Sequence, residues 1–539
     1  MIPSIAIDDG AEALAVMGNR RNTMVLRKRR GTIALSAMLI VLALGYSGAF
    51  AQTPGGIALL ARADALRVAG ELTAAEELYR QGLAESDPST KEGARYIQIC
   101  RDGLESIQYA RISFPYDEDE MNAALAKAYP AWVAAGGNAR KAAKGLESLK
   151  IDGKTMYSEN VIPNLQFRTM ALMHADQAKN KSYASLVDTM LDIAKAWPKD
   201  SWRVYDNPVT YIGKHKVDIP RSKLPAAGTF KMWFPLPITL GYQQPAEVLS
   251  VEPADYLVLP PSSSGAISTL YMEVPLEKLE GPLRAEVRFK FTHYEQHFRV
   301  DLSLVGPYDT SSSDYIAYTG SSGNVAVTPE IKATAEQIVG DEKNPYLAAR
   351  KIYDYMIKTI DYSLMPHLLL YPRSDLRESA YVHDYKLGDC GAQGAYFAAL
   401  CRAVGIPARV PGGWQLFNGY FSPHFWAEFY VPNYGWLPVD PSVGQASLYT
   451  TTADPEARRA YTDFFFGRQD AFRCVVQTNV DEEFIPKFPG TSFFPMAIQN
   501  IDASCDAIDP SKGDSPTLIV FEYSELTVEK AEPSKPLDR

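Results

Sequence analysis

Apolar residues recur every three to four positions between residues 57 and about 196, where Ala, Leu and Met are frequent and β-branched runs are few. This spacing is typical of helices that bury one face. Breaks fall at Gly70 and at Asp87-Pro88, residue types that end helices. We therefore predict a helical domain over residues 52–200.

After Ser201 the pattern changes to a period of two. Segments such as 229–234 (ThrPheLysMetTrpPhe) and 285–292 (AlaGluValArgPheLysPheThr) alternate between apolar and polar residues, and Pro, Gly and Ser clusters separate them. Alternation of this kind predicts strands with one buried face. We expect an antiparallel β domain over residues 201–301.

The last strand of this segment carries His293, Glu295 and His297, which share one face. Two histidines and a carboxylate could hold a metal ion. No further ligand is apparent nearby, so a hydrated strand face is the favoured interpretation. We expect no metal site and no cofactor.

Helical spacing returns over residues 330–339 and 346–358, and strand-like segments follow up to Gly467. Residues 473–480 and 517–523 have the composition of strands and precede a polar tail. The order of elements predicts an α+β fold, with one domain over 327–467 and a C-terminal β segment and tail over 468–539.

The first fifty residues differ from the rest of the chain. ArgLysArgArg at 27–30 precedes an uncharged apolar run, and AlaPheAla at 49–51 fits a cleavage site before Gln52. This is the layout of a signal peptide over residues 1–51, and Met1 to Thr23 is long for such a leader, so a translation start at Met24 is a further hypothesis. An uncleaved membrane anchor is the alternative. We expect a periplasmic or secreted protein that contacts a membrane only through such a segment.

The predicted mature chain is acidic. Without the six Lys/Arg and three Asp/Glu of residues 1–51, 48 basic and 61 acidic residues remain, a net charge of −13. Nucleic acids and anionic lipids need clustered basic residues, so the charge argues against both as partners.

Five cysteines follow the predicted leader: Cys100, Cys390, Cys401, Cys474 and Cys505. Because the number is odd, at least one thiol is free of internal disulfides. Cys474 and Cys505 flank one C-terminal segment and are the pair we expect to be bridged. Cys401 is expected in the core.

Cys390 lies where a loop is predicted to turn into a helix. The segment after it runs to Gly405 and Pro407, which together end a helix. The free N–H groups and the positive end of the helix dipole stabilise a thiolate at a helix start. The position therefore suits a nucleophile.

A β-hairpin is predicted over residues 423–441, with His424 on one arm and Asp440 at the end of the other. The two share a face only if the loop holds an odd number of residues. A three-residue loop that pairs Val431 with Gly435 meets this condition and places Asp440 opposite Trp426, a diagonal neighbour of His424.

Cys390, His424 and Asp440, with GlyIleProAlaArg at 405–409 and GlyTrp at 435–436 between them, resemble the transglutaminase-like superfamily. The resemblance implies a papain-like transglutaminase core after the β domain and the helical domain. It also implies Cys390 as nucleophile, His424 as general base and then acid, and Asp440 as the group that orients the imidazole. Phe425 and Ser442 depart from the usual Ala and Thr, and neither change removes a reacting group.

The resemblance implies a thiol acyl-transfer enzyme that acts on peptide or protein amides. Water as acceptor gives a cysteine peptidase or amidase, and an amine gives a protein-glutamine transamidase. A non-catalytic binding protein on the same scaffold is a third alternative, and the helical domain could bind another protein. An apolar cleft is expected from nearby aromatic residues, Trp414, Phe417, Tyr420, Phe421 and Trp426. His383 could line the cleft, and Tyr362 could help to hold an oxyanion.

Overall fold

The computed structural model describes residues 54–197, 204–261, 265–370, 375–417, 420–490, 498–508 and 515–531. All of these residues belong to one compact unit. The predicted leader over residues 1–51 lies outside the described residues. None of the helices in the described ranges combines the length and the apolar character that crossing a membrane needs.

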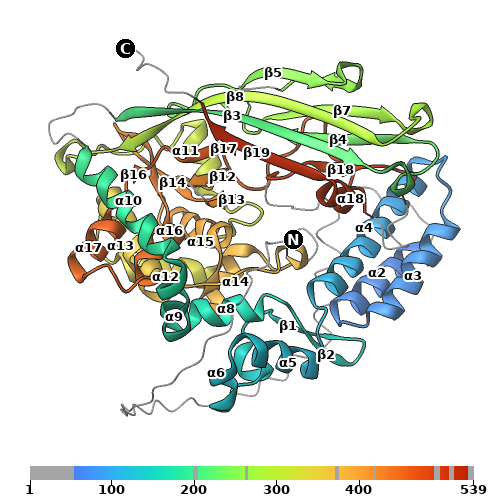
Figure 1. Ribbon diagram of the computed structural model, residues 1–539, viewed down its shortest axis with the longest axis horizontal. Coiled ribbons are helices and arrows are strands. Elements are labelled where there is room, and N and C mark those ends of the chain that lie inside the picture. Colours follow the sequence, from blue (N-terminus) through green and yellow to red (C-terminus); the bar gives the residue numbers. More distant parts are fainter. Residues whose placement is uncertain are drawn as a thin grey trace. The chain divides into compact units, whose positions relative to one another are not determined.

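Helices dominate residues 54–196, as the spacing of apolar residues predicts (Figure 1). One exception is a hairpin, β1 and β2, that turns at Asp152 (φ 46°) and Gly153 (φ 83°). Asp-Gly is a strong hairpin signal because both residues tolerate positive φ. The elements are α2 (Pro54–Val68), α3 (Leu72–Glu85), α4 (Lys91–Ser113), α5 (Glu118–Ala128), α6 (Pro130–Ala134), α7 (Ala139–Ala142), β1 (Ser148–Ile151), β2 (Lys154–Tyr157), α8 (Val161–Arg168), α9 (Met170–Asn180) and α10 (Ser182–Ala196).

Residues 205–297 form antiparallel strands in two sheets. One sheet has the order β16-β8-β3-β19, with β5 also paired to β8, and the other has the order β18-β4-β7-β6. Their inner faces share one apolar core that includes Phe230, Met272 and Phe289. The strands of this region are β3 (Tyr205–Ile219), β4 (Thr229–Pro235), β5 (Glu247–Glu252), β6 (Leu257–Leu259), β7 (Thr269–Pro275) and β8 (Leu283–His297).

The C-terminal segment adds strands to these sheets. β16 (Arg468–Gln469) pairs with β8, β18 (Asp502–Ser504) with β4, and β19 (Ser524–Lys530) with β3. The strand predicted at 517–523 is wrong, because Pro516–Glu522 form helix α18 and the strand follows it. A short apolar run does not by itself distinguish a strand from a buried helix, and Pro516 at the first helical position favours the helix.

Between residues 313 and 403 helices predominate, with the two-residue strands β9 and β10 among them; mostly longer strands follow up to residue 439, and helices α16 and α17 come after them (Figure 1, yellow and orange). β9 pairs in parallel with β10, while β11-β14-β15 and β13-β12-β17 form two small sheets. The α+β class predicted from the sequence is confirmed. The elements are α11 (Ser313–Thr319), α12 (Pro329–Val339), α13 (Pro345–Thr359), β9 (Asp361–Tyr362), the 3-10 turn η5 (His367–Leu369), α14 (Glu378–Tyr385), β10 (Leu387–Gly388), α15 (Cys390–Ala403), β11 (Ala408–Arg409), β12 (Gly412–Phe417), β13 (Tyr420–Phe425), β14 (Ala427–Val431), β15 (Gly435–Val439), α16 (Pro441–Gly444), α17 (Pro455–Phe464) and β17 (Arg473–Gln477).

Helix α15 is the centre of this core. All of its residues from Gly391 to Arg402 are buried. Arg409, which follows α15, donates to buried Glu428 at 2.7 Å and lies 4.3 Å from the ring centre of Trp436. The ion pair and the ring contact join β11, β14 and β15, so the GlyIleProAlaArg segment fastens the hairpin that carries Asp440.

Four of the five cysteines, all except Cys390, are buried in the core. All five are free, so the expected bridge between Cys474 and Cys505 is wrong. Both lie in the core between the two sheets, where a buried thiol behaves as an apolar side chain. Cys401 is fully buried, as predicted.

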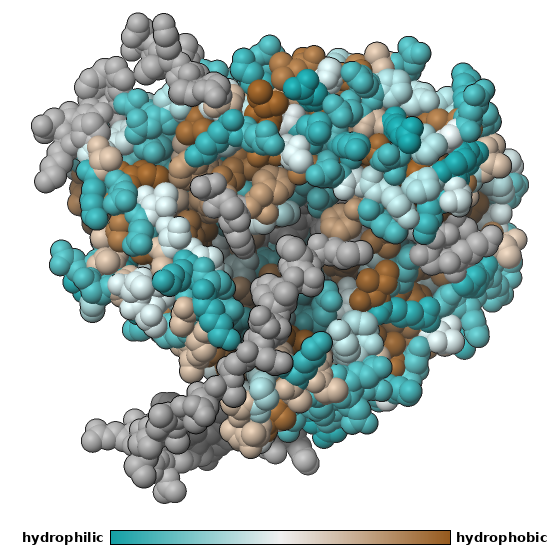
Figure 2. Space-filling view, in the orientation of Figure 1, coloured by the Kyte–Doolittle hydropathy of each residue, from teal (hydrophilic) through white to brown (hydrophobic). Residues whose placement is uncertain are grey.

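Figure 2 shows polar residues over most of the visible face, with apolar residues in small groups among them.

Candidate active site

Cys390 is the first residue of α15, and its side chain is partly buried. Asp389 caps the helix, because its Oδ1 accepts the N–H of Ala392 at 3.1 Å. The helix ends at Ala403, and Gly405 follows with a φ of 78°. The predicted helix start and glycine stop are therefore confirmed.

A close approach brings α15 against the strands that flank Trp426. Gly394 lies one turn after Cys390, and a Cβ on it would lie 2.9 Å from Val410 and 3.1 Å from the carbonyl oxygen of Trp426. Only glycine leaves this gap free. The missing side chain allows the start of the helix to approach the strand that carries His424.

The hairpin has the predicted register, but its first arm is not one continuous strand. Val431 pairs with Gly435 and Ala427 with Val439, as the three-residue loop requires. The continuous strand expected over 423–431 is wrong, because it divides at Trp426 into β13 and β14, which join different sheets. In β13, His424 pairs with Gly413 of β12.

His424 and Asp440 meet despite this break. His424 Nε2 lies 2.8 Å from Asp440 Oδ2, and both side chains are buried. The other oxygen, Oδ1, accepts from the N–H of Val443 at 3.0 Å and the hydroxyl of Ser442 at 3.1 Å. The carboxylate is thus fixed on both sides, and it leaves His424 Nδ1 as the ring nitrogen available to a second partner.

The sulfur of Cys390 lies beside this pair. The backbone N–H groups of Phe425 and Gly391 hydrogen-bond to it, and the charge of Asp440 acts on it. Phe425 follows His424 directly, so the strand that carries the imidazole also contacts the sulfur. The fold brings the three residues predicted from the sequence into one place.

The pKa of the Cys390 thiol is raised, contrary to the expectation from its helix position. Burial is the largest cause, and the charges of Asp389 and Asp440 add to it. The two backbone N–H groups act in the opposite direction but are outweighed. A thiolate here therefore needs a positive partner, and an imidazolium formed on His424 would be one.

Arg473 is a site residue that sequence reasoning missed. Its guanidinium is fully buried, donates to Asp440 Oδ2 at 2.6 Å and to Asp470 Oδ2 at 3.0 Å, and lies 4.9 Å from the ring centre of Trp426. His424 and Arg473 thus share one oxygen of Asp440. An arginine at the start of the apolar run ArgCysValVal is a signal for a buried acidic partner, but it does not say which one.

A second charged group involves Asp389, the residue directly before Cys390. His367 Nε2 is 2.5 Å from Asp389 Oδ2, and His367 Nδ1 is 2.6 Å from Glu378 Oε1. No periodic pattern surrounds His367 in the sequence, so the sequence does not indicate a role for it. The turn η5 places it between the two carboxylates.

His383 faces the hydroxyl of Tyr396 at 3.1 Å. Tyr362 pairs with Gly388, two residues before Cys390, and its ring packs 4.8 Å from that of Phe167. Its part in holding an oxyanion stays a prediction. The expected apolar cleft wall is largely wrong. Trp414, Phe417 and Trp426 are buried and only Phe421 is exposed, while the side chain of Tyr420 lies outside the described residues.

The strand face with His293, Glu295 and His297 is buried rather than hydrated. His293 Nδ1 contacts Gln243 Oε1 at 3.1 Å, and His297 stacks on Trp197 with ring centres 3.4 Å apart. Trp197, which follows α10, covers this face at His297, and β16 pairs with the end of β8. Within the described residues, no group of three His, Cys, Asp or Glu side chains is placed to hold a metal ion.

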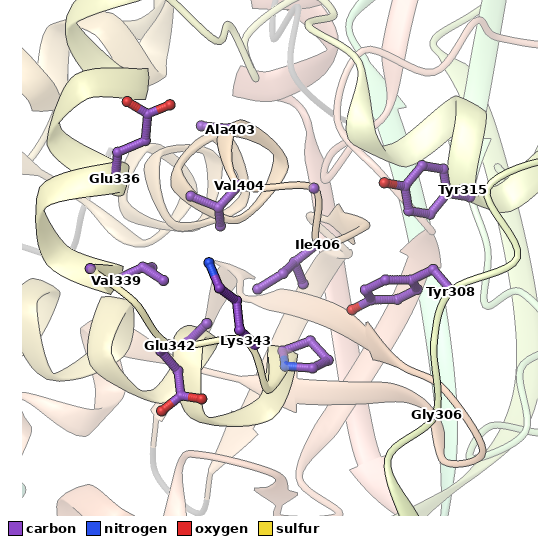
Figure 3. Close-up of a pocket in the computed structure, with 14 residues that line it drawn as sticks. Gly306, Tyr308, Tyr315, Glu336, Val339, Glu342, Lys343, Ala403, Val404 and Ile406 are labelled. Carbon is purple, nitrogen blue, oxygen red and sulfur yellow. The ribbon is translucent and has the colours of Figure 1, made fainter.

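A cavity of about 500 Å³ lies at the opposite end of α15 (Figure 3). Ala403, Val404 and Ile406 line it, together with Lys343, Tyr308 and Tyr315. Cys390 begins the same helix, about 20 Å away at 1.5 Å per residue. None of the three candidate catalytic residues lines this cavity.

The fold and the site define the class of α+β proteins in which a cysteine at a helix start meets a histidine and an aspartate carried by β-strands. The family model of the transglutaminase-like superfamily matches residues 332–441, so this part of the chain is a transglutaminase-like domain. The superfamily includes cysteine proteases and transglutaminases. The matched range contains Cys390, His424 and Asp440.

One curated relative and two solved structures are similar to parts of the chain. A protein-glutamine gamma-glutamyltransferase of Pseudomonas aeruginosa is 36% identical over 72 residues, which are 12% of this chain and 11% of that protein. A candidate cysteine protease from Cytophaga hutchinsonii has a TM-score of 0.36 and 13% identity, and the match covers 61% of this chain and 93% of that one. The periplasmic domain of TgpA from Pseudomonas aeruginosa, bound to ethylmercury, has a TM-score of 0.24 and 14% identity over 47% of this chain and 93% of that one.

Proposed function

We propose that the chain is an exported thiol acyl-transfer enzyme that cleaves amide bonds in peptide or protein substrates, with Cys390, His424 and Asp440 as its catalytic residues. The observation that carries the proposal is the 2.8 Å contact between His424 and Asp440 on the strand whose next N–H group contacts the Cys390 sulfur. A thiol, an imidazole and a fixed carboxylate are the groups that covalent acyl transfer requires.

The proposed reaction has two halves. The Cys390 proton moves to His424, the sulfur attacks the amide carbonyl carbon, and His424 returns the proton to the leaving amine. A thioester then joins the substrate acyl group to Cys390. In the second half His424 takes a proton from water, the resulting hydroxide attacks the thioester, and the acid leaves as the proton returns to the sulfur.

Asp440 supports both halves. Because it holds His424 through Nε2, the ring presents Nδ1 for proton transfer, and the carboxylate stabilises the imidazolium that forms. The N–H groups of Gly391 and Phe425, which contact the sulfur, stabilise the thiolate in the first step.

Hydrolysis is the outcome that we propose for the thioester, because water needs no second binding site beside it. Transamidation is the second candidate, and the name of the Pseudomonas aeruginosa relative favours it. The chemistry is the same up to the thioester, so the product decides between the two.

The test uses an extract of exported proteins treated with wild type, Cys390→Ala and Cys401→Ala. Cys401 is a matched control, because it lies on the same helix and is buried in the core. We expect new peptide termini with wild type and Cys401→Ala and none with Cys390→Ala, measured by mass spectrometry. Isopeptide links in place of new termini would indicate transamidation. Equal product from Cys390→Ala would contradict the enzyme and favour a binding protein.

Export is part of the proposal. The predicted signal peptide supports it, and one structural neighbour is a periplasmic domain. We propose a periplasmic or secreted location, with cleavage before Gln52. N-terminal sequencing of the protein recovered from the periplasm or the medium is the check, and a start before Gln52 would contradict cleavage there.

A further inference from the structure

An imidazole held between two carboxylates lies beside the candidate nucleophile. His367 contacts Asp389 through Nε2 at 2.5 Å and Glu378 through Nδ1 at 2.6 Å. Both acidic side chains are largely buried, at 11% and 1% exposed, whereas His367 is 25% exposed. A carboxylate can only accept, so two ionised carboxylates require a hydrogen on each ring nitrogen. The arrangement therefore fits an imidazolium.

The charges agree with this protonation state. Burial alone would lower the pKa of His367, but the charges of Asp389 and Glu378 outweigh it and raise that pKa well above its usual value. Burial raises the pKa of Glu378, and the charge of His367 opposes the rise. The positive charge of the imidazolium thus stabilises two carboxylates that are buried close to each other.

Asp389 connects this group to the sulfur. It directly precedes Cys390, and its Oδ1 caps α15 at Ala392 while its Oδ2 contacts His367. Its charge opposes a thiolate on Cys390. Asp389 therefore fixes the helix start but also disfavours the thiolate form of Cys390. The positive charge of His367 offsets this second effect.

Other elements hold His367 in this place. Leu369 of the same turn packs against the apolar core of α2, α3 and α4. The charged residues of α4 on this side have partners elsewhere, since Arg101 pairs with Asp506 at 3.5 Å and Glu105 accepts from Tyr109 at 2.6 Å. Asp102, also on α4, accepts from Gln98 at 3.0 Å. The charge of Glu378 also acts on Asp481 and helps to raise the pKa of that carboxyl.

We propose that His367 is a positioning residue for Cys390, which fixes the Asp389 cap at the start of α15 and cancels its negative charge so that the adjacent sulfur can become a thiolate. The proposal rests on the function proposed above only in taking Cys390 as the nucleophile. It also gives the N-terminal helices a role, because they support the turn that carries His367.

The test measures alkylation of Cys390 by iodoacetamide against pH, with the peptide that contains Cys390 followed by mass spectrometry. In His367→Gln we expect the midpoint of the profile to rise by about one pH unit, the size of a shift from one nearby like charge. Well below the midpoint, the alkylation rate should fall about tenfold, since each unit of pKa changes the thiolate fraction tenfold.

Two further variants separate charge from structure. His367→Gln with Asp389→Asn should return to the wild-type midpoint, because asparagine still caps a helix but carries no charge. His383→Gln is the matched control, because His383 lies on α14, contacts Tyr396 and should leave the midpoint unchanged. If His367→Gln does not fold, Asp389→Asn alone still tests the proposal. Its alkylation midpoint should fall below that of wild type, because the variant removes the negative charge next to Cys390.

The proposal is overturned if folded His367→Gln keeps the wild-type midpoint, if the double variant keeps the raised one, or if His383→Gln shifts it as much. A midpoint in Asp389→Asn that does not fall overturns it as well. Alkylation requires no substrate, so the result is separate from peptide cleavage. If Cys390→Ala still cleaves peptides, the proposed enzymatic function is refuted. The alkylation profiles of the His367 and Asp389 variants would still decide on the role of His367.

Discussion

Arg473→Met removes the cation that lies between two buried carboxylates. The guanidinium and both partners, Asp440 and Asp470, are at most 1% exposed, with N to O distances of 2.6 and 3.0 Å. Methionine is an unbranched side chain without a charge, so the two carboxylates would lose the cation that lies between them. Loss of one member of a buried ion pair costs about 3–5 kcal/mol, and we expect the free energy of unfolding to fall by that amount at pH 7.5.

The loss should depend on pH with a defined sign. Burial would raise the pKa of Asp440, but the charges of His424 and Arg473 outweigh it and hold that pKa below its usual value. The stabilisation from this carboxylate is therefore fully present above its unfolded pKa, about 3.9, and is lost as the pH falls through the folded value. Without Arg473 the carboxylates take up protons at higher pH, so the difference between variant and wild type should shrink as the pH falls towards about 4.

The assay is urea unfolding followed by near-UV circular dichroism at pH 7.5 and 5.0. Arg350→Met is the matched control, because Arg350 also contacts two aspartates, Asp354 at 2.8 Å and Asp463 at 2.5 Å, but is one-third exposed. Surface pairs contribute about 0–1 kcal/mol, so this variant should lose little. An equal loss in the two variants at pH 7.5, or a loss for Arg473→Met that grows at pH 5.0, would refute the reasoning.

Two more predictions concern packing and titration. Gly394→Ala should lower the free energy of unfolding by about 1–3 kcal/mol, because the new methyl group would press on Trp426. Gly281→Ala, with open space at the same atom, should change it by less than about 1 kcal/mol, and equal thermal unfolding of the two would contradict the close approach. Burial raises the pKa of Asp481 to about 6, so the folded state holds this proton more tightly than the unfolded chain. The contribution of this group to the free energy of unfolding should decline as the pH rises from about 4 to 6. In Asp481→Asn, denaturation curves should show a smaller decline over this range, and the same decline as in wild type would contradict the prediction.

Local rules predicted those parts of the fold that depend on short segments. An odd number of residues in the hairpin loop predicted the pairing of Val431 with Gly435, and Gly405 and Pro407 predicted the end of α15. The same rules failed where a segment was ambiguous. Residues 517–523 are apolar enough for either a strand or a buried helix, and only their tertiary position decides between the two.

The supporting charges of the site could not be predicted in the same way. Arg473 reaches Asp440 because β17 pairs with β12, so two residues 33 positions apart in sequence become neighbours. His367 reaches Asp389 through a 3-10 turn that carries no periodic pattern. Motifs identify reacting groups because their spacing is local, whereas the partners that tune those groups arrive through long-range pairing.

The two supporting groups have the same design. In each, one cation lies between two largely buried carboxylates, His367 between Glu378 and Asp389, and Arg473 between Asp440 and Asp470. Each group keeps one net negative charge when its members are ionised, which favours an imidazolium on the catalytic histidine and opposes a thiolate. Each cation limits this opposition by pairing with a carboxylate whose charge acts on the sulfur, Asp389 or Asp440. A partly buried thiol with a raised pKa can then act as a nucleophile if its proton passes to His424, because the same surroundings stabilise the positive charge of that histidine.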